Sequence, residues 1–223
     1  LPEWIELVIS SQFSEFIYND FSTHNLTGEI SYRDKMLTGI DLQGDALEGY
    51  LHSNFILKEP TKNYLVLNSQ IKMEKINIRK TFESFNNFDQ DFILDSQING
   101  VGTGELDVES HWKPSFIFDE KKLKIKSHII IEQGELIDFK PLENLSAFVS
   151  LEDLKHVKFS TLENTIEVMN KIITIPTMEI KSSALSVFVS GTHTFEQEID
   201  YNIKLLLSEL LSNSFRKKNT NLN

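Results

Sequence analysis

Six histidines are the side chains of this sequence with the clearest capacity for acid–base or metal chemistry, and they are scattered along the chain. They are His24, His52, His111, His128, His156 and His193. No two of them have the i, i+4 spacing around a glutamate that binds zinc on a helix. The chain also lacks cysteine, which excludes thiol nucleophiles, disulfides and cysteine metal sites. We therefore interpret the histidines as surface or turn residues, with His193 in a turn, and expect neither a metal nor a cofactor.

Other catalytic patterns are equally incomplete. Gly100, Gly102 and Gly104 resemble part of a nucleotide-binding loop, but no Lys-Ser or Lys-Thr follows them. The chain has no Gly-x-Ser-x-Gly elbow. The acidic residues of the strand-like segments, such as Asp41 and Asp107, are dispersed and fit a solvated polar face better than a paired acid and base. We expect a protein that is not an enzyme.

The composition of the chain narrows the classes of partner that it could bind. The 223 residues carry a formal net charge of −11, which argues against nucleic acid and against electrostatic docking on anionic lipid. No run of about 18 apolar residues exists, so no segment of the sequence reads as a membrane span. The chain begins at Leu1 without methionine. We predict a single domain over residues 1–223, as a fragment of a longer membrane-anchored protein.

Hydrophobic alternation predicts mainly β structure. Residues 27–34, 37–43, 46–57 and 64–76 alternate apolar and polar side chains with the period of a strand. Helical spacing appears at residues 4–17, 78–88, 141–148 and 203–211, the last as the leucine-rich stripe from Ile203 to Leu211. The fold class predicted is a curled, groove-like sheet of long antiparallel strands with a few short capping helices.

Residues 178–190 read as one strand of 13 residues, about 43 Å long at about 3.3 Å per residue. Their apolar side chains change parity, from the even Met178 and Ile180 to the odd Leu185, Val187 and Val189. A β-bulge near Ser182 and Ser183 would restore a single apolar face. Alternation shows that such a face exists, but it leaves open whether the face is exposed or covered.

Four segments resemble AsmA-like proteins, in the C-terminal region of the Bacteroidetes type. They are residues 76–88, 129–142, 157–166 and 180–201, the last reading Ile-Lys-Ser-Ser-Ala-Leu-Ser-Val-Phe-Val-Ser-Gly-Thr-His-Thr-Phe-Glu-Gln-Glu-Ile-Asp-Tyr. The resemblance covers about two thirds of the chain, from Lys75 to Phe215, and residues 1–74 fit the family less distinctively. The family has no catalytic motif to transfer.

The resemblance implies a periplasmic segment, tethered to the inner membrane in the full-length protein and related to TamB-like and YhdP-like envelope proteins. It implies phospholipid binding in an apolar β-groove that supports lipid transfer between the inner and outer membranes, and so outer-membrane homeostasis. Membrane contact would come through parts of the full-length protein absent here, and envelope proteins are possible partners. The residues expected to line the groove are Leu65, Leu67, Ile71, Met73, Leu94, Ile98, Leu106, Val108, Leu123, Ile125, Ile129, Ile131, Leu185, Val187 and Val189.

Two other interpretations stay open. The apolar face could be a closed core, in which case the protein is a non-enzymatic scaffold or assembly module for outer-membrane biogenesis. The helix at residues 203–211 could either plug the face or end the sheet. A sugar-binding β-sandwich is weaker, because it calls for clustered aromatic side chains and the two tryptophans, Trp4 and Trp112, are far apart.

Overall fold

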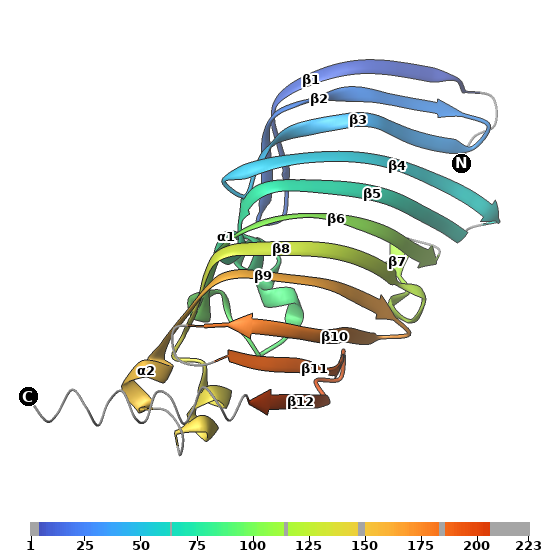
Figure 1. The fold of residues 1–223 in the computed structure, drawn as a ribbon. Helices are drawn as coiled ribbons and strands as arrows, with labels where there is room; N and C mark the ends of the chain where they lie inside the picture. Colours follow the sequence, from blue (N-terminus) through green and yellow to red (C-terminus); the bar gives the residue numbers. More distant parts are fainter. Residues whose placement is uncertain (1–4, 63, 114–115, 147–149, 183–185, 206–223) are drawn as a thin grey trace, which may run out of the picture.

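The computed structural model describes residues 5–62, 64–113, 116–146, 150–182 and 186–205, and they form one antiparallel sheet of 12 strands (Figure 1). The strands lie side by side in chain order, except that β7 pairs with β6 and leaves β6 beside β8. They are β1 (Leu7–Tyr18), β2 (Phe21–Arg33), β3 (Met36–Ala46), β4 (Gly49–Thr61), β5 (Tyr64–Asn77), β6 (Ile98–Lys113), β7 (Ile117–Phe118), β8 (Lys124–Ile137), β9 (His156–Met169), β10 (Ile172–Lys181), β11 (Ser186–Thr194) and β12 (Ile199–Leu205). The antiparallel β fold expected from alternation is confirmed. Within the described residues β1 and β12 are not paired with each other, so the sheet is not closed.

Tight hairpins account for this simple order. Three of the connections are two-residue loops in which both residues have positive φ, as the loop type that matches the twist of paired strands requires. The pairs are Asp34 and Lys35, Leu47 and Glu48, and Asn170 and Lys171. Each loop is too short to reach anywhere but the neighbouring position, so each strand returns beside the one before it.

Bulges interrupt the long strands. Asn25, Asp41, Lys75, Gly100 and Gln133 lie inside β2, β3, β5, β6 and β8 with φ of 53°, 49°, 52°, 153° and 52°. The pairing register with a neighbouring strand shifts beside each of them, as between Gly39 and Leu42 or between Met73 and Ile76. Gly100 and Gln133 face the same shift, and the extra residue there belongs to β8. A bulge bends its strand and increases the local twist. Figure 1 shows that the long strands are bent along their length.

Short helices occupy three of the connections. α1 (Ile78–Ser84), η1 (Asn86–Asp89) and η2 (Asp95–Gln97) join β5 to β6, η4 (Glu120–Lys122) joins β7 to β8, and η5 (Lys140–Leu145) and α2 (Leu151–Lys155) join β8 to β9. Asn77 caps α1, because its Oδ1 accepts a hydrogen bond from the backbone N–H of Lys80 at 3.1 Å. The proline-led short helix expected near residue 141 is confirmed as η5.

The helix predicted at residues 4–17 is wrong, because this segment contains β1. The misleading feature is the three-residue spacing of Phe13 and Phe16. Phe13 pairs with Leu26 and Phe16 pairs with Thr23 across β2, on either side of Asn25. The bulge at Asn25 places residues three apart on one face, which imitates the period of a helix.

The long strand predicted at residues 178–190 is also wrong. β10 ends at Lys181 and β11 begins at Ser186, and these two residues pair directly as the end of a hairpin. In this hairpin each even-numbered residue of β10 pairs with an odd-numbered residue of β11, as Ile180 does with Val187. The change from even to odd apolar positions therefore follows from the pairing itself, and no bulge near Ser182 is needed. A bulge does occur in β10, between Ile175 and Met178. The predicted helix at residues 203–211 begins inside β12, which includes Ile203, and residues 206–211 lie outside the described part of the chain.

The space beside two glycines of the sheet, Gly102 and Gly134, is filled by neighbouring apolar side chains. The most buried side chain, Ile76, lies where α1 leaves the sheet, and Ile78 of α1 packs over Gly102. A Cβ added at Gly102 would lie 2.6 Å from Ile78 Cδ1. Likewise, the ring of Phe159 covers Gly134, its direct partner across β8 and β9. The absence of a side chain at Gly102 thus permits the close approach of the protein's own helix.

We predict that Gly134→Ala destabilises the sheet through Phe159. The added Cβ would lie 2.0 Å from Phe159 ring atoms, so the ring must move, and overpacking of this kind costs about 1–3 kcal/mol of unfolding free energy. Chemical denaturation measures the loss. In a Phe159→Leu background the same substitution should cost clearly less, because the clashing ring is gone. Equal costs in both backgrounds would show that the ring is not the cause.

Candidate functional site

One face of the sheet is apolar across its whole width. Directly paired residues of antiparallel strands project to the same side. A single row of such pairs crosses eleven strands: Ile9, Ile30, Gly39, Phe55, Ser69, Val108, Ile125, Val168, Ile173, His193 and Ile199. We call the side to which this row projects the apolar face. Seven of its eleven members are aliphatic residues, and an eighth is Phe55.

Twelve of the fifteen candidate residues lie on the apolar face. They are Leu65, Leu67, Ile71, Met73, Ile98, Leu106, Val108, Ile125, Ile129, Ile131, Val187 and Val189. The other three do not. Leu94 precedes η2 in the connection between β5 and β6, and Leu123 lies just before β8. Leu185 lies outside the described residues.

Most of the apolar face is not covered by the described part of the chain. Of the twelve candidates on it, only Ile98 and Val187 are buried, and the other ten are half-buried. The face continues onto the edge strand β1, where Leu7, Ile9 and Phe13 are exposed. A closed core would bury such side chains almost completely. The contiguous exposed apolar surface is therefore the feature of this fold that calls for a functional explanation.

One segment covers part of the apolar face. Residues 78–97, which we call the strap, run from α1 to η2. Phe85 of the strap stacks on Phe21 at the start of β2, with ring centroids 5.7 Å apart. Phe92 of the strap packs against two residues of the face, His193 in β11 and Tyr201 in β12, at 5.8 and 5.3 Å. The strap therefore spans from the β2 side of the sheet to β12.

The interior of the strap is held by its own polar side chains. The Oε1 of Gln90 accepts hydrogen bonds from the backbone N–H groups of Phe92 and Ile93, at 2.7 and 3.0 Å. The Oδ1 of Asn87 accepts another from the N–H of Asp95, at 2.7 Å. These contacts fix the loop that presents Phe92 to the sheet. Leu94, expected to line the apolar face, belongs instead to the segment that lies over it.

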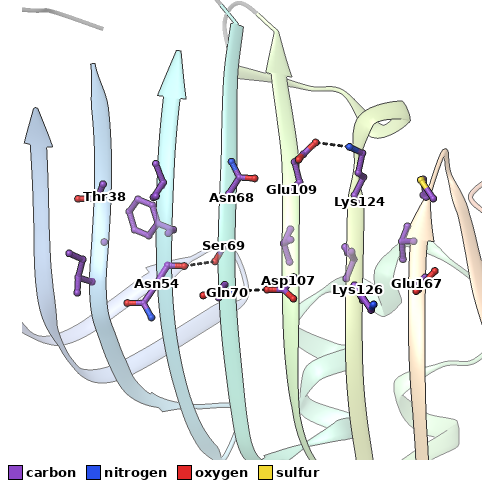
Figure 2. A pocket seen from close by; sticks show the side chains of 18 residues that line it. Thr38, Asn54, Asn68, Ser69, Gln70, Asp107, Glu109, Lys124, Lys126 and Glu167 are labelled. Carbon is purple, nitrogen blue, oxygen red and sulfur yellow. Dashed lines mark hydrogen bonds and ion pairs between the residues drawn. The ribbon is translucent and has the colours of Figure 1, made fainter. Parts of the chain in front are cut away.

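A hollow of about 670 Å³ crosses β3, β4, β5, β6, β8 and β9 (Figure 2). Its floor is the row from Gly39 to Val168, and its walls are the residues before and after the row on each strand. Because side chains alternate, those wall residues project away from the apolar face. Face residues further along the strands, such as Leu67 and Leu106, do not line it. The hollow thus belongs to the opposite, polar side of the sheet.

Paired polar groups fill much of that polar side. Gln70 Nε2 donates a hydrogen bond to Asp107 Oδ1 at 3.1 Å, and Lys124 Nζ donates one to Glu109 Oε1 at 3.0 Å (Figure 2). Hydrogen bonds from His111 and then Lys124 hold the pKa of Glu109 below its ordinary value. These are cross-strand or neighbouring pairs of a solvated surface.

Five histidines have the same environment. His24, His52, His111, His128 and His156 each lie within 4 Å of one carboxylate, at distances of 3.9, 3.1, 2.8, 2.8 and 3.1 Å. Among the described residues no group of three His, Asp or Glu side chains is arranged to hold a metal ion. His193 is different, because it lies in β11 and is buried beneath Phe92. Its predicted position in a turn is wrong.

Sequence reasoning missed the contribution of the outer strands to the apolar face. Leu51, Phe55 and Leu57 of β4 pair with Met73, Ser69 and Leu67 of β5 and so share their side. Their common parity was a usable signal. The strap gave a weaker signal, because Phe92 and Leu94 have the parity of the β6 residues that follow them and so imitate a continuing strand.

No family model, curated protein or solved structure matches this chain. None of the helices in the described residues is long and apolar enough to cross a bilayer. The arrangement itself is therefore the basis for any functional argument.

We predict that Phe92→Ala uncovers more of the apolar face. Loss of the ring removes contacts with Phe139, His193 and Tyr201, and should lower the unfolding free energy by about 1–3 kcal/mol, less than for a fully buried ring. The fluorescence of a dye that binds exposed apolar surface should rise. Phe88→Ala is the matched control, because Phe88 is in the strap but its ring packs on Phe82 and Phe85, which are also strap residues. Equal dye binding by both variants would contradict a covering role for Phe92.

We predict that His193 makes the protein less stable in mild acid. Burial lowers the pKa of His193, so the unfolded chain, where the pKa is about 6.5, takes up the proton more readily. The stability contributed by the neutral ring is present above that pH and is lost as the pH falls below it. Between pH 7.5 and 5.5 the wild type should lose more unfolding free energy than His193→Phe, which cannot titrate. Identical pH dependence would contradict this assignment.

Proposed function

We propose that this protein shields the acyl chains of lipids on its apolar face, and that the bent sheet forms a groove for them. The observation that carries the proposal is the row of paired residues that keeps one side apolar across eleven strands while most of that side stays half-exposed. Each methylene removed from water contributes about 0.8 kcal/mol, so an apolar surface of this extent strongly favours hydrocarbon over water.

The dimensions suit acyl chains. Neighbouring strands lie about 4.8 Å apart, so a row over eleven strands extends for about 48 Å, more than the about 30 Å hydrocarbon core of a whole bilayer. The bulges in β2, β3, β5 and β8 bend the strands. Bending turns a flat apolar surface into a trough in which a chain touches protein on more than one side, while a charged headgroup stays in water.

The resemblance to AsmA-like proteins supplies the biological setting of the proposal. In that setting the chain is the periplasmic part of a protein tethered to the inner membrane, and the groove supports phospholipid transfer between the inner and outer membranes and outer-membrane homeostasis. The protein acts by binding and does no chemistry on the lipid, in keeping with the paired, dispersed titratable groups of the polar side.

The alternative is a scaffold whose apolar face is a core. The strap favours it locally, because Phe92 and Ile78 cover the face near β6, β11 and β12. The half-burial of Leu67, Ile71 and Leu106 favours a lipid-binding face over the rest of the sheet. We therefore assign lipid binding to the uncovered region and a structural role to the strap.

We predict that Leu67→Asp removes bound lipid and Asn68→Asp does not. The two residues are adjacent in β5 and half-buried, and both substitutions introduce one aspartate, but only Leu67 lies on the apolar face. A carboxylate there has to be desolvated by an acyl chain, which should reduce lipid recovered from the purified protein at least about fivefold. Mass spectrometry of extracted lipids, normalised to protein, measures the effect.

Circular dichroism should show that both variants remain folded. If the wild type carries no phospholipid after purification and does not acquire any from vesicles, the lipid proposal fails. Equal lipid in the two variants would place the binding surface elsewhere than the apolar face.

A further inference from the structure

The most exposed large apolar side chain of the described residues is Phe116, at 71% exposure, and it is followed by Ile117 at 60%. Phe118, the next residue, is also exposed. We call these three residues the β7 tip. The two residues of β7 pair with the end of β6, Ile117 with Lys113 and Phe118 with Trp112. Pairing with β6 holds the tip in place at one end of the sheet (Figure 1).

The β7 tip is continuous with the apolar face. Trp112 pairs with Leu65 of β5 and so lies on that face, at its end. The ring of Phe118 packs on Trp112, with centroids 5.1 Å apart. The apolar path therefore runs from Leu65 and Trp112 to Phe118, and the protruding Phe116 and Ile117 precede Phe118 directly in the chain. A solitary exposed phenylalanine needs no explanation, but three consecutive exposed apolar residues beside an apolar face do.

The surroundings of the tip are those of a segment at a membrane interface. Lys122 places its ammonium 4.5 Å above the ring of Tyr64, and Lys113 lies 3.6 Å from Asp119. Aromatic rings and lysines with long apolar stems are the side chains that favour the boundary between headgroups and acyl chains. The nearby charges, including Asp119, largely balance, so contact would depend on apolar insertion rather than on anionic lipid.

We propose that the β7 tip inserts into the surface of a lipid bilayer and brings the end of the apolar face against the membrane. Phe116 and Ile117 enter the interface, and Trp112 and Phe118 form the passage between the acyl-chain region and the sheet. This goes beyond lipid binding, because it names the bilayer as a partner and the end of β6 as the place where lipid enters or leaves. It is also independent of the resemblance, which placed membrane contact in other parts of the full-length protein.

Flotation with phosphatidylcholine vesicles tests the proposal. The variant Phe116→Ser with Ile117→Ser should bind vesicles at least about tenfold more weakly, since burying one such side chain is worth about a factor of ten or more. The matched control is Phe88→Ser with Leu151→Ser, which removes two apolar side chains of similar exposure, 53% and 55%, at other sites. The control should float like the wild type. Adding phosphatidylglycerol to the vesicles should change the binding little.

Two outcomes overturn the proposal. One is a wild type that does not float, which would leave the tip as a contact for another protein. The other is an equal loss of vesicle binding by the test and control variants.

Tryptophan fluorescence gives a second readout that does not depend on affinity. In a Trp4→Phe background Trp112 is the only tryptophan, and brominated phosphatidylcholine should quench its fluorescence. Absence of quenching with bound vesicles would also contradict insertion. Lipid extracted from a wild type that does not float would reject the tip and leave the proposed lipid-binding face intact.

Discussion

Register is the constraint on which the rest of this structure depends. A strand that slipped by one residue against its neighbour would send its apolar side chains to the opposite side of the sheet. Ten successive pairings nevertheless keep Ile9, Phe55 and Ile199 in one row. The three tight hairpins fix the registers of β2 with β3, of β3 with β4 and of β9 with β10 locally, because a two-residue loop leaves no freedom to shift.

The bulges have to be compatible with that constraint, and the register shows how. Gln133 is the extra residue of β8, because Glu132 pairs with Val101 and Glu135 pairs with Asn99, so three steps along β8 match two along β6. The extra residue changes the parity of β8, and Leu136, paired with Ile98, therefore lies on the same side as Ile131, paired with Gly102. A bulge of this kind lets the sheet bend while its sides remain distinct, and this combination makes a one-sided, bent surface possible.

Much of the face could be predicted from the sequence, because alternation is a local property. Leu65 to Met73 and Ile125 to Ile131 were placed correctly by parity alone. What failed depended on partners that parity does not reveal. The spacing of Phe13 and Phe16 looked helical because of Asn25, a residue of the next strand. The strap could not be predicted from the sequence either. Phe92 is identified as a covering residue only by its contacts with β11 and β12, which lie about a hundred residues further along the chain.

The strap is held against the sheet at the cost of backbone strain, and this limits how much of the face it can cover. Residues 86–89 have four consecutive positive φ values, 48°, 52°, 56° and 54°. Asparagine and aspartate tolerate this region, but Phe88 does so at a cost of about 1–2 kcal/mol. Aromatic contacts of Phe85 and Phe92 are the natural compensation, since each such pair contributes about 0.5–1.5 kcal/mol beyond its buried area. A segment so nearly balanced is stable only where it finds rings to pack on, at Phe21 on one side and Tyr201 on the other. Among the described residues, the aliphatic middle of the face around Ile71 and Leu106 offers no ring for the strap to pack on, and both side chains stay half-buried.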